Sequence, residues 1–332
     1  MIKDITKKFL ENKNKYSKKM VSRDARDISM FEFKNDLNVA SKQIMYDEIE
    51  FHNVFSTEFT NLNTKKKLES RDKLKNIVVK NGKIIEFNMI YCESGIFTMG
   101  SNDSNDNNPK RVVEIESPFW LGETEITQEL YQLVMGYNPS RHQDAEAYSI
   151  RRPVERVTWY DAIMFCNKLS MLLGKSPYYT MRSIQYEEDT YKYSIKKASL
   201  KINEGANGFR LPLSKEWEYA AKASTNNKWS GTNDKSQLKD YAWLYDNSNL
   251  RGDRQTVPIA KKNPNEWGFY DMTGNVSEWC WDVPIINKSL RVHRGSSATA
   301  DMKYSPITHE SKASVDTRMN VIGFRVASSL SL

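Results

Sequence analysis

The hydrophobic positions of the first eighty residues recur at helical spacing. The best stretch carries them at Ile49, Phe51, Val54, Phe55, Phe59 and Leu62. That spacing puts the apolar side chains on one face of an α-helix. The segment contains neither Pro nor Gly. Residues 1–80 are therefore predicted to be a helical segment that packs on the rest of the chain or joins a partner, with packing favoured.

The pattern changes near residue 80. Lys80–Lys83 (KNGK) is a turn signal, and the strand-like run IIEFNMIYC follows it. Beyond it, short strand-like runs, turns rich in Gly, Asn and Asp, and a few capped helices alternate without a βαβ rhythm. We predict a domain boundary at about residue 80 and an α+β domain over residues 81–332.

Two helices are predicted with their ends. The first has Thr158 as N-cap, Asp161 at the third position as in a capping box, and Gly174 as its stop. Its periodicity places Cys166 on the buried face. The second helix is predicted to begin at a capping Ser214.

Two further segments have simple predictions. The phrase IGFRVA (322–327) is expected to be a short terminal strand, with Ile322, Phe324 and Val326 on one face and Arg325 on the other. Residues 101–109, SNDSNDNNP, are expected to be a solvated loop.

Composition supports a packed core. The chain has 332 residues, of which 39% are hydrophobic and 11% aromatic. It contains no run of 18 apolar residues, so no membrane span is predicted. The N-terminus lacks the apolar region of a secretory signal, which predicts a cytoplasmic protein and leaves surface display open.

Positive charge is concentrated at the N-terminus. Residues 1–80 hold 18 Lys and Arg against 12 Asp and Glu, whereas the remainder holds 31 against 30. Acids interleave the lysines, which is typical of a solvated helical surface. The basic segment could dock a partner, but nucleic-acid binding is not expected.

Cysteine and histidine are scarce. The chain has three cysteines, and their odd number argues against a disulfide framework. Cys280 lies between Trp279 and Trp281. It could be a reactive thiol or a soft apolar atom in an aromatic core, and the second interpretation is favoured.

Seven short sequence motifs occur in a fixed order along the second domain. They are FTMGS (97–101), ETEITQELYQLVMG (123–136), RPVERVTWYDAIMFCNKLS (152–170), NGFRLPLSKEWEYAAKA (207–223), NPNEWGFYDMTGNVSEWCWD (263–282), RVHRGSS (291–297) and IGFRVA (322–327). In this order they resemble the formylglycine-generating enzyme family, the sulfatase-modifying factors. The resemblance covers about residues 83–328. It implies a variant of the C-type lectin fold with short strands, two main helices and much irregular structure.

The same resemblance argues against the family's oxidase activity. Enzymes of the family hold copper with two cysteine thiolates five residues apart, shortly after an Arg-Gly-Gly-Ser type phrase, and soft thiolates suit Cu(I). Counted from Arg294, the matching positions here are Ala300 and Ser305. Copper is therefore not expected, and the chain is interpreted as a non-catalytic member, or pseudoenzyme.

Some members of the family carry structural calcium. One such site lies at the Gly-Asn-x-x-Glu turn, and oxygen ligands from a turn suit this ion. The resemblance would place it on the side chains of Asp271 and Glu278 with the carbonyls of Gly274 and Val276. Alternatively, backbone N–H groups of the protein donate hydrogen bonds to both carboxylates and no ion is bound.

A third group in the family, the variable proteins of diversity-generating retroelements, displays a binding surface near the C-terminus. Its bracketing phrases resemble RVHRGSS (291–297) and IGFR (322–325). We therefore predict ligand recognition, of a protein or another surface ligand, over about residues 293–320. The expected contact residues are His293, Ala298, Thr299, Asp301, Lys303, Thr308 and Glu310.

Two alternatives stay open. Ser296, Ala298 and Glu310 stand where the family has Gly, Trp and Arg, so the chain could be a degenerate paralogue whose former active-site face binds something else. It could also be an enzyme of the formylglycine-generating or non-haem-metal oxidase class that uses residues other than the absent cysteine pair. The lack of a thiol pair and the four histidines weigh against an enzyme.

Overall fold

The structure is a computed structural model. It describes residue 68 and residues 71–329, apart from 104–107, 144–148, 189–192, 251–252 and 285–286. All of the described residues belong to the second of two units, which spans residues 53–332. The predicted helix face from Ile49 to Leu62 lies outside the described residues.

The predicted turn at Lys80–Lys83 is confirmed as the tip of a hairpin. Strand β1 (Lys73–Lys80) pairs antiparallel with β2 (Lys83–Cys92), and Lys80 faces Lys83. Asn81 and Gly82 have φ of 52° and 74°, values that Asn and Gly tolerate in two-residue hairpin turns. The helical prediction was wrong for residues 73–80, because pairing with β2 determines their conformation.

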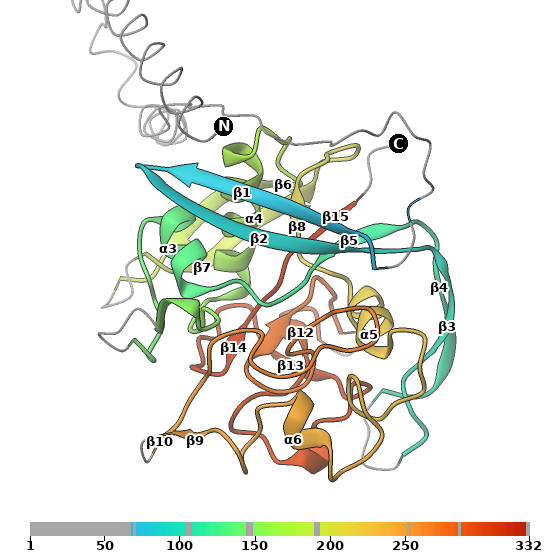
Figure 1. Ribbon diagram of the computed structural model, residues 1–332. Helices are drawn as coiled ribbons and strands as arrows, with labels where there is room; N and C mark the ends of the chain where they lie inside the picture. Colours follow the sequence, from blue (N-terminus) through green and yellow to red (C-terminus); the bar gives the residue numbers. More distant parts are fainter. Residues whose placement is uncertain are drawn as a thin grey trace, which may run out of the picture. The chain divides into compact units, whose positions relative to one another are not determined.

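A five-stranded antiparallel sheet joins the two ends of the described chain. Its order is β1-β2-β5-β15-β8, so the first and last strands share one sheet (Figure 1). The remaining members are β5 (Phe119–Gly122), β15 (Ala327–Ser329) and β8 (Phe209–Arg210). Leu121 of β5 pairs with both Ile90 of β2 and Ala327 of β15. All three are fully buried.

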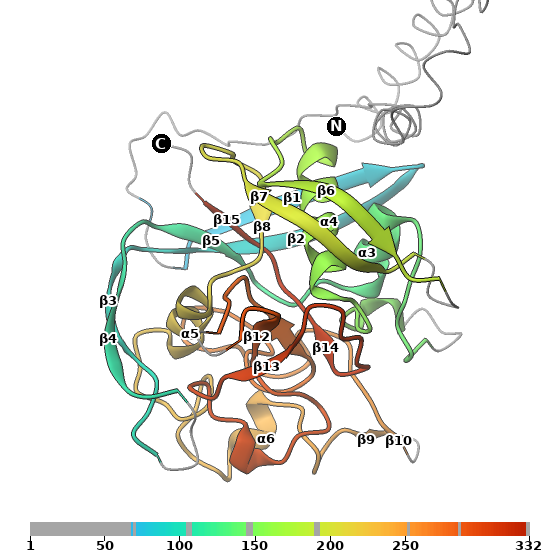
Figure 2. The ribbon, with the colours of Figure 1, turned by 180° about the vertical axis from the view of Figure 1, so that it is seen from behind.

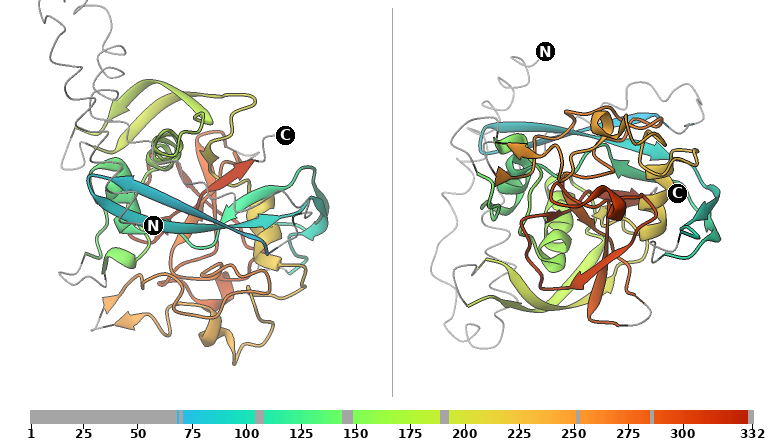
Figure 3. Two further views of the ribbon diagram at one scale, coloured as in Figure 1. Left: turned by 45° about the horizontal axis from the view of Figure 1, so that its top comes forward. Right: turned by 90° about the horizontal axis from the view of Figure 1, so that it is seen from below.

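Helices α3 (Gln128–Met135) and α4 (Trp159–Leu172) pack against this sheet. The predicted capping of α4 is confirmed: Thr158 Oγ1 accepts from Asp161 N and Asp161 Oδ2 accepts from Thr158 N, both at 3.0 Å. Tyr131 of α3 stacks on Phe165 of α4 with ring centroids 5.5 Å apart. The strands β6 (Tyr179–Tyr186) and β7 (Ile195–Ile202) form a ribbon on the other side of α4 (Figures 2 and 3).

The start of helix α5 (Ser214–Lys222) differs from the prediction. Ser214 is the first helical residue and not the cap. Its N–H donates to Asp282 Oδ2 at 2.5 Å, and Glu216 Oε2 accepts from Leu213 N at 2.8 Å. Two acidic side chains, one of them from a distant segment, therefore cap this helix.

A second sheet carries the C-terminal half of the domain. Its order is β13-β12-β11-β14, with β11 and β14 parallel. The strands are β11 (Ser277–Trp279), β12 (Leu290–Arg294), β13 (Ser311–Ser314) and β14 (Ile322–Gly323). The phrase IGFRVA is not one strand, as predicted, because β14 ends at Gly323 and β15 begins at Ala327 in the other sheet.

The other elements are short. A ribbon pairs β3 (Gly95–Met99) with β4 (Arg111–Ile115), and a smaller one pairs β9 (Asn249–Leu250) with β10 (Asp253–Arg254). The remaining helical turns are η2 (Ser149–Arg151), α6 (Leu238–Tyr241) and η3 (Met302–Tyr304). No helix in the described ranges is long and apolar enough to cross a membrane.

Candidate functional site

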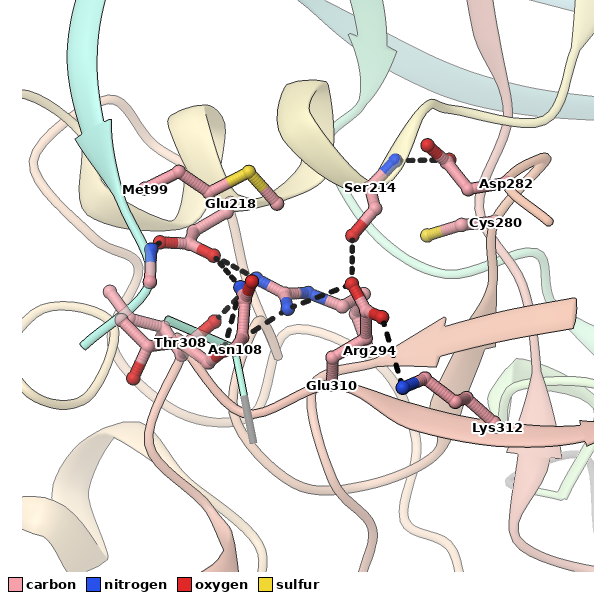
Figure 4. Close-up of polar contacts among 12 residues, drawn as sticks. Met99, Asn108, Ser214, Glu218, Cys280, Asp282, Arg294, Thr308, Glu310 and Lys312 are labelled. Atoms are coloured by element: carbon pink, nitrogen blue, oxygen red, sulfur yellow. Dashed lines mark hydrogen bonds and ion pairs between the residues drawn. The ribbon is translucent and has the colours of Figure 1, made fainter. Parts of the chain in front are cut away.

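A buried ion pair fixes the start of the 293–320 segment. Arg294, at the end of β12, pairs with Glu218 of α5, and both side chains are inaccessible to solvent. Arg294 Nη2 also donates to the Ile307 carbonyl at 2.9 Å, and Nη1 donates to the Thr308 carbonyl at 3.2 Å (Figure 4). One guanidinium thus holds the middle of the segment against the scaffold.

The same cluster includes Asn108, from the loop that was predicted to be solvated. Asn108 is 4% exposed, and its amide donates to Glu218 Oε2 at 3.2 Å and to the Thr308 carbonyl at 3.1 Å (Figure 4). For Asn108 the prediction of a solvated loop was wrong, because these acceptors draw it inside.

A second buried ion pair fixes the end of the segment. Arg325 follows β14 and binds both oxygens of Glu278, with Nε to Oε2 at 2.6 Å and Nη2 to Oε1 at 2.7 Å. Trp217 Nε1 also donates to Glu278 Oε2 at 2.8 Å. Charge-assisted bidentate pairs of this kind are strong and directional.

Between these anchors, the predicted contact residues fall into two groups. Thr299, Asp301 and Lys303 are exposed. Thr308 and Glu310 are half-buried and tied to the scaffold: Glu310 accepts from Ser214 Oγ at 3.2 Å and lies 3.8 Å from Lys312 (Figure 4). The structure therefore places the three exposed residues of the predicted set close to the short helix η3.

His293 lies at the edge of this surface, on β12. Its Nδ1 is 2.6 Å from Ser277 Oγ, and its ring meets Trp279 edge-on at 5.6 Å. Burial, and next the charge of His309, lower the pKa of His293 to about 4. The side chain is thus neutral at physiological pH.

One predicted contact residue was wrong and two candidates were missed. Ala298 is fully buried, so its side chain is out of reach of a ligand, and its N–H donates to the Asn275 carbonyl at 2.9 Å. Tyr304 and Met319 are about half exposed, at 51% and 49%. An exposed tyrosine in a polar segment is typical of binding surfaces, and that signal was available in the sequence.

The residues present do not fit a two-thiolate copper site. At the two positions that the resemblance identifies, Ala300 has no ligating side chain and Ser305 is buried. Ser305 Oγ donates to the Asp301 carbonyl at 3.0 Å and lies 2.8 Å from Ser296 Oγ. A hard, hydrogen-bonded hydroxyl is a poor Cu(I) ligand.

The three cysteines of the chain are buried core residues. Cys92, Cys166 and Cys280 are all free thiols with no exposed surface. Burial raises the pKa of each thiol. Cys280 packs in a cluster with Phe119 and Trp217, and its Sγ is 3.8 Å from the Glu278 carbonyl. The prediction that Cys280 is buried among aromatic neighbours is confirmed.

The predicted calcium ligands are arranged differently from the expectation. Glu278 gives both oxygens to Arg325 and Trp217, and Asp271 Oδ2 accepts from Ala260 N at 2.8 Å. The buried side-chain oxygens without a hydrogen-bond partner in the described part of the chain include Asp271 Oδ1 and both oxygens of Glu125. A cation at this turn would thus be held by Asp271 and Glu125, with carbonyls such as those of Gly274 and Val276.

The charges at this turn are compatible with such a cation. Burial raises the pKa of Asp271 to about 6, and burial together with the Asp271 charge raises the pKa of Glu125 well above its usual range. No group of three or more His, Cys, Asp and Glu side chains forms a metal site in the described part of the chain. Calcium binding stays a prediction.

The comparisons with known proteins agree with this architecture. Residues 77–330 match the sulfatase-modifying factor enzyme 1-like domain. The chain therefore belongs to the formylglycine-generating enzyme family, and its short strands and curled sheets form a C-type-lectin-like fold.

The chain is also similar to three named proteins. It is 36% identical to Treponema denticola variable protein 1, with a TM-score of 0.67 over 78% of this chain and 99% of that one. It is 35% identical to the chaperone protein LppX of Paenibacillus barcinonensis over 68% of this chain and 83% of the relative. It is 28% identical to the formylglycine-generating enzyme of Mus musculus, over 36% of this chain and 39% of that enzyme.

Proposed function

We propose that this chain is a non-catalytic binding protein that recognises its ligand through the 293–320 segment. The observation that carries the proposal is the pair of buried arginine anchors, Arg294–Glu218 and Arg325–Glu278, on either side of an exposed polar stretch. Recognition residues are commonly found on loops that a rigid scaffold positions. The likeness to a variable protein over nearly its full length supports the same function.

The exposed centre of the surface is formed by η3 and its flanks. Asp301 Oδ1 accepts from Lys303 N at 2.9 Å and so orders the turn. Lys303 Nζ lies 4.7 Å from the ring centre of Tyr304, which is 51% exposed. The side chains of Tyr304 and Lys303 are already ordered against each other. A ligand that contacts them therefore loses less side-chain conformational entropy on binding.

Site-specific photocrosslinking tests this proposal. A benzophenone amino acid is placed at Tyr304, or at Ile84 as a control that is 60% exposed in the β1–β2 hairpin. In cells that produce the chain, the Tyr304 variant is expected to yield a discrete crosslinked species that the Ile84 variant lacks. Equal crosslinking from both positions would contradict recognition through this surface.

The LppX relative favours a second candidate function, binding of a client protein as a chaperone. In this case the same exposed surface would hold a partly folded chain. The test is light scattering of a thermally unfolded model protein at a substoichiometric amount of this chain. Suppression that is lost in a Tyr304→Ser variant supports the chaperone function, and unchanged aggregation argues against it.

Catalysis by residues other than the cysteine pair is the weaker alternative. The described thiols are buried with raised pKa values, and His293 is neutral and bonded to Ser277. Oxidation of a cysteine-containing sulfatase peptide in the presence of copper would revive this alternative.

A further inference from the structure

A basic pocket lies between the β6–β7 ribbon and the start of β12. It encloses about 340 Å³. Four basic residues line it, Lys196 and Lys197 of β7 and Lys288 and Arg291 near β12, and Asp316 is the one acidic residue of the lining. A concave surface of one dominant sign concentrates ligands of the opposite charge.

Two of the three lysines of this pocket have no carboxylate partner in the described part of the chain. Lys196 lies 3.7 Å from Glu187, but Lys197 and Lys288 have no carboxylate within ion-pair distance among the described residues. Asp316 also makes no ion pair there. Like charges held near one another without a partner repel, so an anion between them would stabilise the arrangement.

Arg291 is held in position at the pocket wall. Its guanidinium carbon lies 4.2 Å from the ring centre of Trp159. Its Nη1 donates to the carbonyls of Lys288 and Leu290, at 2.9 and 2.7 Å. Its Nε is buried without a hydrogen-bond partner in the described part of the chain. Because Nε is buried, a ligand in the pocket would meet the Nη2 donors of this stacked and anchored guanidinium, which make no hydrogen bond in the described part of the chain.

From this geometry we infer that the pocket binds a phosphorylated small molecule of about the size of a mononucleotide or a sugar phosphate. Lysine ammonium groups and an oriented guanidinium are the side chains that bind phosphate. The volume lies at the lower end of the range for small-molecule sites. Tyr160 and Val315 add apolar wall for the rest of the ligand. The inference goes beyond the proposed function and does not depend on it.

Isothermal titration of the full chain at low ionic strength tests the inference, because salt screens exposed charges. The probes are pyrophosphate and AMP, with adenosine and sodium sulfate as comparisons. We expect pyrophosphate and AMP to bind saturably at one site and adenosine not to bind. The Lys197→Gln/Lys288→Gln variant should bind AMP about 100-fold more weakly, at about tenfold for each lost charged donor.

The matched control is Lys201→Gln/Lys235→Gln, which removes two exposed lysines outside the pocket and should leave the affinity unchanged. Circular dichroism verifies that both variants fold. The inference is overturned if AMP does not saturate at millimolar concentration, or if both double variants lose affinity equally. Sulfate that binds as tightly as pyrophosphate would overturn the assignment to phosphate. Photocrosslinking at Tyr304 tests a different surface, so a negative crosslinking result would not affect the interpretation of the AMP titration.

Discussion

The substitution Glu218→Gln tests the anchor of the proposed binding surface. It keeps the side-chain shape and an acceptor for Gly100 N, which donates to Glu218 Oε1 at 2.6 Å. It removes the charge that faces Arg294 and Lys222, whose Nζ is 3.4 Å away. The new amide group would also meet donors from Arg294 and Asn108.

The expected cost follows from burial. Both members of the Glu218–Arg294 pair have no exposed side-chain surface. Removing the charge of Glu218 leaves the buried Arg294 with only Glu310, whose Oε2 is 4.0 Å from Nη1. Loss of one partner of a buried pair costs about 3–5 kcal/mol in comparable pairs. The exposed pair Lys75–Glu86 is the control, since its side chains are 59% and 52% exposed, and Glu86→Gln should cost under about 1 kcal/mol.

Urea unfolding at 25 °C measures both variants, with an unchanged m-value as the condition for comparing them. Adding Arg294→Met to Glu218→Gln should recover part of the loss, because it removes the buried guanidinium that has lost its carboxylate. Lys222 still lacks its partner, so the recovery is incomplete. Amide exchange near Thr308 should quicken in Glu218→Gln, since Arg294 holds that carbonyl. A loss no larger than that of Glu86→Gln, or strict additivity in the double variant, would refute the reasoning.

Three further outcomes are expected. Burial raises the pKa of Glu155 from 4.5 to about 7, so its contribution to stability is present below pH 4.5 and is lost as the pH rises through about 7. The free energy of unfolding of Glu155→Gln should thus rise relative to wild type as the pH increases, by up to about 3 kcal/mol at pH 8 in chemical denaturation. A difference that does not change with pH would contradict this. Gly274→Ala should destabilise the fold by several kcal/mol, because the new Cβ would lie 2.1 Å from the Trp243 carbonyl oxygen. Gly136→Ala should cost only about 1 kcal/mol, because its Cβ would lie in open space. Equal melting temperatures of the two variants would count against this reasoning. Millimolar calcium should raise the melting temperature of wild type but not of Asp271→Asn, and an unchanged wild type would exclude this cation site.

Local sequence patterns predicted the local structure well. The capping box at Thr158 and Asp161 and the hairpin turn at Asn81 are set by neighbouring residues, so both could be read from the chain. The buried thiol of Cys280 followed from its aromatic neighbours. The order of the seven phrases indicated the family, and the domain match over residues 77–330 confirms it.

The long-range contacts could not be read in this way. Ser214 looked like a helix cap, but Asp282, 68 positions away, takes that role. Ala298 looked like part of an exposed segment, yet the Asn275 carbonyl draws its backbone inside. The Glu218–Arg294 pair joins residues 76 positions apart, and no local periodicity indicates it.

We propose that this member of the family binds its ligand without oxidising cysteine. The most direct measurement is mass spectrometry of a cysteine-containing sulfatase peptide after incubation with the purified chain, copper and oxygen. With Ala300 and Ser305 at the positions of the family's thiolates, we predict that the peptide cysteine is recovered unconverted. Formylglycine in the peptide would contradict the claim.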